Sequence, residues 1–152
     1  MLVRIGAEDP RQPELLAMLA DSDRYYAALY PAESNHLLDA STLAGPEVTF
    51  LVARMPDRIA GFGAIVRHPG RFGEIKRMYV DPAMRGLKLG RSILTALEER
   101  ARAEGLPCLR LETGVKQPEA IALYRSAGYE AIPPFGDYQP DPLSIFMEKR
   151  LA

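Results

Sequence analysis

A basic segment that contains two glycines, Arg85–Gly90, separates a strand-like run from a helix-like run. The strand-like run is Glu74–Val80, which Asp81 and Pro82 close. After the segment, apolar residues recur at the three-to-four spacing of one helix face (Leu89, Ile93, Leu94, Leu97 and Ala101). The first backbone N–H groups of a helix have no internal partner and carry partial positive charge. A strand, a basic turn and a helix in this order therefore predict a site for a pyrophosphate-bearing cofactor.

The segment does not identify that cofactor. It is not a Walker loop, because no Gly-Lys-Ser/Thr closes it, and the dinucleotide fingerprint Gly-x-Gly-x-x-Gly is absent. An ordinary link between a strand and a helix, in which Gly86 serves the turn, is the alternative that these six residues leave open.

The length and charge of the chain narrow the class of protein. A chain of 152 residues suits one domain with one sizeable core, spanning residues 1–152. The net charge of −1 argues against a nucleic-acid binder, since such domains are usually basic overall. A polyanion site must therefore be local, and the stretch from Arg85 to Arg91 holds three cations and no acid.

Cysteine and histidine are too scarce for a disulfide framework or a metal site. The one cysteine, Cys108, opens an apolar run and is expected to be a buried strand thiol, and His36 and His68 lie far apart in the sequence. The N-terminus lacks a signal-peptide pattern, and no apolar run approaches about 18 residues. These features predict a soluble cytoplasmic protein without metal or membrane.

Apolar periodicity and turn residues predict the element order β α α β β β α β α β β, and helices packed on a mixed sheet of six or seven strands follow from it. The predicted strands are Met1–Gly6, Thr49–Arg54, Ile59–Arg67, Glu74–Val80, Cys108–Thr113, Tyr129–Ile132 and Leu143–Lys149. The predicted helices are Pro13–Ala20, a short helix from Ser34 to Leu38, Leu89 to about Glu104, and Pro118–Ala127.

Three segments within residues 74–129 resemble the GNAT superfamily of acyl-CoA-dependent N-acyltransferases, in particular its small bacterial-type members. They are Glu74–Val80 with Asp81-Pro82, then Arg85-Gly86-x-x-x-Gly90, and finally Leu111-Glu112-Thr113 with Gln117-x-x-Ala120-x-x-Leu123-Tyr124 and Ala127-Gly128-Tyr129. The resemblance implies an α/β (mixed α+β) single domain with a mostly antiparallel sheet and about four helices. It also implies direct transfer of an acetyl group from acetyl-CoA to a primary amine.

The resemblance assigns residues to the cofactor. Backbone near Val80 would face the thioester, and the N–H groups of Leu87, Leu89, Gly90 and Arg91 would cradle the pyrophosphate. A bulged or splayed strand exit would free the N–H near Val80. The residues implied in acetyl-CoA binding are Met78, Tyr79, Val80, Arg85, Gly86, Leu87, Lys88, Leu89, Gly90, Arg91, Gln117, Ala120 and Tyr124.

Two of these positions depart from the usual motif of the family. Lys88 stands where the family usually has glycine, and it can donate its N–H in the same way provided that its φ is negative. Gln117 stands where asparagine is frequent, and both residues carry an amide.

The same resemblance implies the catalytic residues. Tyr124 matches the tyrosine that protonates the departing thiolate, and a phenol with a pKa of about 10 is neutral at pH 7. Glu74 is the first candidate for the general base, acting through a water, and Glu112 is the second. In a regular strand Glu74 shares a face with Met78 and Val80. The alternatives are a core role for Tyr124, a solvated strand-end carboxylate for Glu74 and a loop-fixing sheet residue for Glu112.

The acceptor is expected between the N-terminal helices and the last hairpin, where Tyr30, Asn35, His36, Phe135 and Tyr138 are candidates to line a pocket. Packing and turn roles for these residues stay open. A small amine or an amino-acid-like acceptor is the first expectation, because no extended acidic or basic patch suggests a peptide track. The alternatives are a protein lysine or N-terminal amine, a non-catalytic acyl-CoA sensor and a phosphate-binding regulatory domain. Similar proteins are often homodimers, so a homodimer is also possible.

Overall fold

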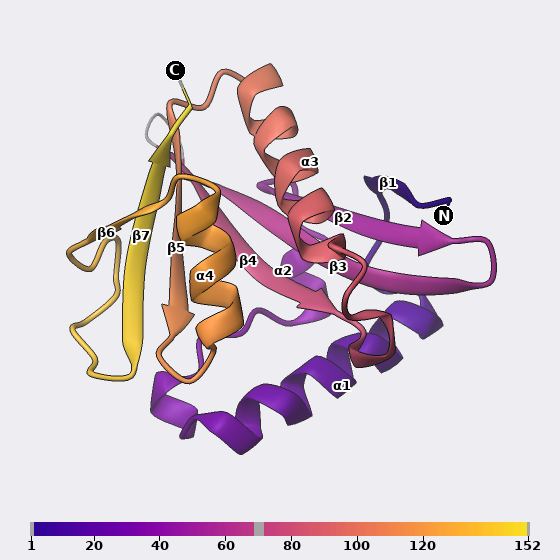
Figure 1. Cartoon of the computed structure of the whole chain (residues 1–152), viewed down its shortest axis with the longest axis horizontal. Helices are drawn as coiled ribbons and strands as arrows, with labels where there is room; N and C mark the ends of the chain where they lie inside the picture. Colours follow the sequence, from indigo (N-terminus) through magenta and orange to yellow (C-terminus); the bar gives the residue numbers. More distant parts are fainter. Residues whose placement is uncertain (1, 69–71, 152) are drawn as a thin grey trace.

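The computed structural model describes residues 2–68 and 72–151, and the strands in these ranges form one seven-stranded sheet (Figure 1). The strand order is β1-β2-β3-β4-β5-β7-β6, and every pair is antiparallel except β4 with β5. This confirms the predicted mixed, mostly antiparallel sheet. The strands are β1 Arg4–Ala7, β2 Val48–Met55, β3 Arg58–His68, β4 Phe72–Val80, β5 Cys108–Gly114, β6 Glu130–Ile132 and β7 Ser144–Arg150.

Helices cover both faces of this sheet. Figure 1 shows α3 and α4 in front of the sheet, and α1 crosses its lower end from the other side. The α-helices are α1 Pro13–Leu29, α2 Ala40–Leu43, α3 Leu89–Ala103 and α4 Pro118–Ser126, and the short 3₁₀ helices are η1 Ala32–Ser34 and η2 Pro82–Met84. In the described part of the chain, no helix combines the length and the apolar character that crossing a membrane requires.

Two predictions about the N-terminal helices were wrong. The first helix does not end at Ala20 but continues to Leu29, because Ser22 is buried and its hydroxyl bonds back to the carbonyl of Leu19 within the helix. Ser34 does not begin a helix, because its hydroxyl donates to Asp141 at 2.6 Å instead of capping a helix. The second α-helix begins later and is capped by Asp39, whose carboxylate accepts from a backbone N–H at 2.8 Å.

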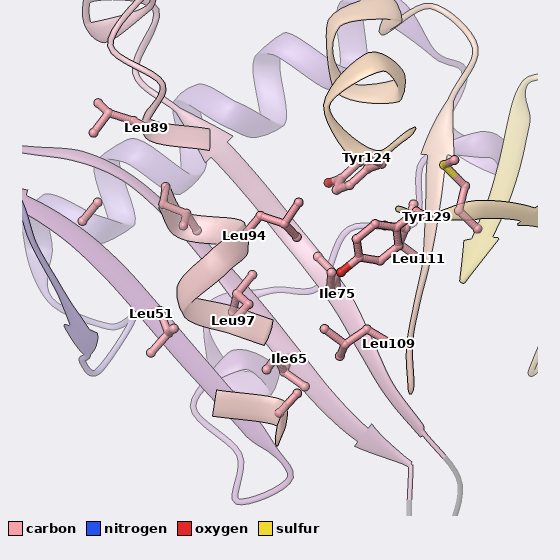
Figure 2. Close-up of a cluster of buried hydrophobic side chains, with 14 of the residues drawn as sticks. Leu51, Ile65, Ile75, Leu89, Leu94, Leu97, Leu109, Leu111, Tyr124 and Tyr129 are labelled. Atoms are coloured by element: carbon pink, nitrogen blue, oxygen red, sulfur yellow. The ribbon is translucent and has the colours of Figure 1, made fainter. Parts of the chain in front are cut away.

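Each face of the sheet carries its own buried cluster. On the α1 side, Leu15, Leu19 and Phe62 belong to one cluster. On the α3 and α4 side, a larger cluster of leucines and isoleucines extends to Tyr124 and Tyr129, which Figure 2 shows beside one another at its edge. Because helices bury both faces, the central strands β2 and β3 are apolar along most of their length rather than alternating.

Candidate active site

A cavity of about 930 Å³ opens where β4 and β5 diverge. These parallel strands pair at three positions, from Gly73 with Leu109 to Ile75 with Leu111. Beyond that point β4 remains paired with β3, and β5 remains paired with β7. The gap between the two strand ends is lined by side chains from α1, β4, the start of α3, β5 and α4.

A bulge in β4 shapes one wall of the cavity. The register with β3 shifts opposite Phe62 and Ala64, and Arg77 adopts a φ of 59°. Because of the extra residue, Lys76 and Arg77 both point to the α1 side. The expected bulge is therefore present. Glu74 would share a face with Met78 and Val80 only in a regular strand, and the bulge interrupts the alternation between these positions, so it does not.

Helix α1 holds the bulge through buried polar contacts. The Arg77 guanidinium, which is 2% exposed, donates to Asp23 at 2.5 Å, to the Ser22 hydroxyl at 2.9 Å and to the Leu19 carbonyl at 3.2 Å. One turn further on, the Tyr26 hydroxyl donates to the carbonyl of Met78 at 3.0 Å. Burial raises the pKa of Tyr26 to about 12, so this phenol stays protonated at neutral pH.

The opposite wall contains the N-terminus of α3. Among the described residues no side chain caps this helix end, so its first backbone N–H groups are available to a ligand. Gly86 and Lys88 adopt φ values of 85° and 58°. The condition of a negative φ at Lys88 is therefore not met, and its left-handed backbone explains why glycine is usual at this position. Arg85, Lys88 and Arg91 surround the helix end with positive charge.

Tyr124 lies on α4 between these two walls and is 6% exposed. Its ring contacts Tyr129 edge to face at 5.7 Å, and the Tyr129 hydroxyl donates to the buried carboxylate of Glu98 at 2.8 Å. Burial raises the pKa of Tyr124 far above its ordinary value, so the phenol is neutral at physiological pH. Within residues 2–68 and 72–151 its hydroxyl has no hydrogen-bond partner, which leaves the proton free for a ligand.

Tyr30 crosses the floor of the cavity at the end of β5. Its hydroxyl donates to the Gln117 side-chain oxygen at 3.2 Å and accepts from the backbone N–H of Lys116 at 3.1 Å. A Cβ on Gly114 would lie 1.8 Å from this hydroxyl. The glycine is therefore required for Tyr30 to reach this position.

The two candidate bases occupy different environments. Glu112 lines the cavity, and one of its oxygens accepts from the Ser144 hydroxyl at 2.7 Å. No described residue donates to its other oxygen. Burial raises the pKa of Glu112 above its ordinary value.

Glu74, in contrast, is 4% exposed and lies outside the cavity lining. It is enclosed by the Tyr138 hydroxyl at 2.6 Å, His68 Nε2 at 3.0 Å and Lys76 Nζ at 3.4 Å.

The sequence-predicted residues therefore divide into two groups. The cavity brings together Met78, Tyr79, Val80, Arg85, Gly86, Lys88, Leu89, Gly90, Arg91, Gln117, Ala120, Tyr124, Tyr30, Asn35, His36 and Glu112. Four others, namely Glu74, Leu87, Phe135 and Tyr138, do not line it. Phe135 packs instead in a small aromatic cluster with Phe72 and Phe146.

Sequence reasoning missed several lining residues, among them Tyr26, Lys76 and Lys116. The spacing of Tyr26 and Tyr30, four positions apart on one helix face, was the available signal for a shared surface. Nothing in the local sequence marks Lys116. Among the described residues no group of three His, Cys, Asp or Glu side chains could hold a metal ion.

Comparison with known proteins identifies a family. The sequence model of the Acetyltransferase (GNAT) family matches residues 15–129. The chain is 52% identical over 150 residues to the IAA acetyltransferase of Azospirillum brasilense, with 98% of each protein covered. It is 30% identical over 126 residues to the aminoalkylphosphonate N-acetyltransferase of Salmonella typhimurium, with 75% of this chain and 82% of the relative covered.

Solved structures agree with this match. A Klebsiella pneumoniae protein assigned to the acyl-CoA N-acyltransferases is 41% identical and superposes with a TM-score of 0.84, with 99% of each chain covered. The PaiA N-acetyltransferase of Thermoplasma acidophilum, solved with coenzyme A, superposes with a TM-score of 0.74 at 18% identity and 99% coverage of both chains. The second likeness extends to the fold alone.

Proposed function

We propose that this chain, which belongs to the GNAT family of acetyltransferases, transfers the acetyl group of acetyl-CoA to the primary amine of a small molecule. As a family member it is an acyltransferase with acetyl-CoA as cosubstrate. One observation carries the proposal. A single cavity joins an uncapped basic helix end, a protonated tyrosine and a partly buried carboxylate.

The α3 end of the cavity fits the pyrophosphate of acetyl-CoA. The free N–H groups of the first helical turn and the positive end of the helix dipole favour an anion. Arg91 lies in that turn, and Arg85 and Lys88 precede it, so three cations surround the same position. Because Gly90 has no Cβ, the helix can pack closely against α4: a Cβ there would lie 3.3 Å from the Leu123 side chain.

We assign the general acid to Tyr124 and the base to Glu112. In the transfer, the amine nitrogen forms a bond to the acetyl carbon while the carbon–sulfur bond breaks. The electron pair goes to sulfur, which takes the phenol proton of Tyr124. The amine loses a proton through a water to Glu112, which lines the cavity. Glu74, already enclosed by three donors, is better suited to positioning Lys76 than to proton transfer.

The relatives support a small-molecule acceptor. The Salmonella relative is named for a small amine substrate, and the Azospirillum relative is named for IAA. These names belong to the relatives, so the acceptor class proposed for this chain is argued from the residues of its own cavity. A protein lysine or N-terminal amine is the alternative that an amine screen decides.

Ligand-dependent stability tests the cofactor, and thiol release tests the reaction. Acetyl-CoA at 100 times its Kd stabilises a protein by about 2.7 kcal/mol, which for this size raises Tm by roughly 5–10 °C. ATP and NAD are expected to give no such rise. A panel of small amines then yields free CoA thiol, while a non-catalytic sensor would bind acetyl-CoA and release none. Absence of a shift with saturating acetyl-CoA would contradict the proposal.

A further inference from the structure

The side chains that line the cavity carry more positive than negative charge. The lining contains six Lys or Arg residues and two acids, namely Lys76, Arg77, Arg85, Lys88, Arg91 and Lys116 against Glu112 and Glu119. An acceptor with several ammonium groups needs several carboxylates around it. This cavity offers the opposite balance, so the acceptor does not match a polycation.

Five of the six cations are accounted for. Arg85, Lys88 and Arg91 lie at the α3 end, where the cofactor pyrophosphate is assigned. The Lys76 ammonium meets three acceptors, namely Glu74, the His36 carbonyl at 3.1 Å and the Tyr138 hydroxyl. Arg77 is paired with Asp23. Lys116 is the remaining cation.

Lys116 lies in the link between β5 and α4 and is exposed. Its ammonium donates to the Leu29 carbonyl at 3.0 Å, at the C-terminal end of α1, and lies 5.9 Å from the centre of the Tyr30 ring. No carboxylate in the described ranges pairs with it. The contact with the helix end uses one N–H of the ammonium, and an ammonium has three. Two donors are therefore available to a ligand.

The acceptor end thus holds one unpaired charge of each sign. Glu112 is the acid at this end, and its second oxygen has no donor among the described residues. Tyr30 connects the two groups. Its hydroxyl accepts from the backbone N–H of Lys116 at 3.1 Å and lies 1.8 Å from where a Cβ on Gly114 would be. Glu112, two residues earlier in β5, points to the same face of the strand as position 114. An acceptor with its ammonium near Glu112 and its anion near Lys116 would therefore extend along the Tyr30 side chain.

We propose that the acceptor is a primary amine that also carries an acid group, with its nitrogen facing Glu112 and its acid bound by Lys116. This inference rests on the proposed transfer to a small amine and names the class of that amine. An acid group is recognised here as an anion, so carboxylates and sulfonates are both included. Polyamines and other multiply cationic amines are disfavoured because they place a second ammonium near Lys116.

Matched amines of equal length test the proposal. Glycine, β-alanine and 4-aminobutyrate are each compared with the corresponding amide, and β-alanine also with 1,3-diaminopropane. The expected order of kcat/KM is acid above amide above diamine, with about a ten- to hundredfold preference for the acid at the best length, the range of a hydrogen bond to a charged group. Taurine provides the sulfonate counterpart of β-alanine.

Two variants test whether Lys116 causes the preference for the acid-bearing amine. Lys116→Met is expected to bring kcat/KM for the acid down toward that of its amide, and Lys116→Glu to favour the diamine over the acid. Arg100→Met removes a cation from an exposed position on α3 outside the cavity and is expected to keep the wild-type preference.

The outcomes separate this inference from the proposed function. Equal turnover of acid, amide and diamine, or a preference that survives Lys116→Met, would overturn the acid-bearing acceptor and leave the acetyltransferase standing. Turnover of none of these amines would overturn the acid-bearing acceptor, whereas absence of CoA release with the whole panel of small amines, in a protein that acetyl-CoA stabilises, would overturn the proposed function as well.

Discussion

The two ends of the cavity are built in different ways. At the cofactor end, consecutive residues from Arg85 to Arg91 provide backbone N–H groups and cations. At the acceptor end, side chains meet from segments far apart in the sequence, as when Tyr30 bonds to Gln117, 87 positions away, and Ser34 to Asp141, 107 positions away. A site of backbone groups tolerates side-chain changes, whereas a site of converging side chains does not. Substitutions at the two ends should therefore have separable effects.

The largest effect is expected at Tyr124, where the two ends meet. Tyr124→Phe removes the proposed acid but keeps the ring in its contact with Tyr129. We expect kcat to fall by about a hundredfold or more, within the usual range for general acid catalysis. The Kd for acetyl-CoA and the Tm should change little, because the hydroxyl has no partner among the described residues. A kcat equal to the wild type with every competent amine would remove Tyr124 as the acid.

The next effect distinguishes the two carboxylates. Glu112→Gln is expected to lower kcat/KM for the amine by about ten- to a hundredfold, with the Kd for acetyl-CoA unchanged. Glu74→Gln should lower kcat/KM less and Tm more, because Glu74 accepts from Tyr138, His68 and Lys76. The reverse order would return the base role to Glu74.

The pH dependence of Glu112 has a definite sign. Its folded-state pKa is raised by burial above the ordinary 4.5, so the folded protein binds a proton more tightly than the unfolded chain. The stability from this group is present below the unfolded pKa and is lost as pH rises through the folded pKa. Wild-type stability relative to Glu112→Gln should therefore decline as pH rises above 4.5, as urea unfolding at several pH values would show.

The comparison of the two ends also explains how much could be predicted from the sequence. The element order and the basic turn at Arg85–Gly90 are local, so spacing and turn residues predicted them. The placement of Glu74 was not predictable in this way, because one extra residue at the Arg77 bulge reverses which face each later side chain occupies. Tyr138 and Lys116 reach their positions through tertiary contacts, for which the local sequence holds no signal.

A steric change at the acceptor end should have a moderate effect. Gly114→Ala places a Cβ 1.8 Å from the Tyr30 hydroxyl, so the tyrosine must move. Overpacking of this kind costs about 1–3 kcal/mol, which lowers Tm by roughly 2–12 °C at this chain length. The KM for the amine should rise as Tyr30 leaves the floor of the cavity.

Gly6→Ala is the matched control for this steric change, because a Cβ there meets nothing within 4 Å. If Gly114→Ala were as stable and active as Gly6→Ala, the packed position of Tyr30 would be wrong.

The smallest effect is expected at the cofactor end, at Lys88. A left-handed backbone, as at Lys88, destabilises a residue other than glycine by about 1–2 kcal/mol. Glycine avoids this strain, but ordering its more flexible unfolded backbone costs about 0.5–1 kcal/mol. Lys88→Gly should therefore raise the free energy of unfolding by up to about 1 kcal/mol in urea titrations. Lys88→Ala removes the same charge but keeps the strain, so it should give no gain. Both variants should bind acetyl-CoA with similar affinity, because the helix N–H groups remain. A large loss of affinity in both would mean that the ammonium of Lys88, rather than the backbone, dominates this end of the cavity.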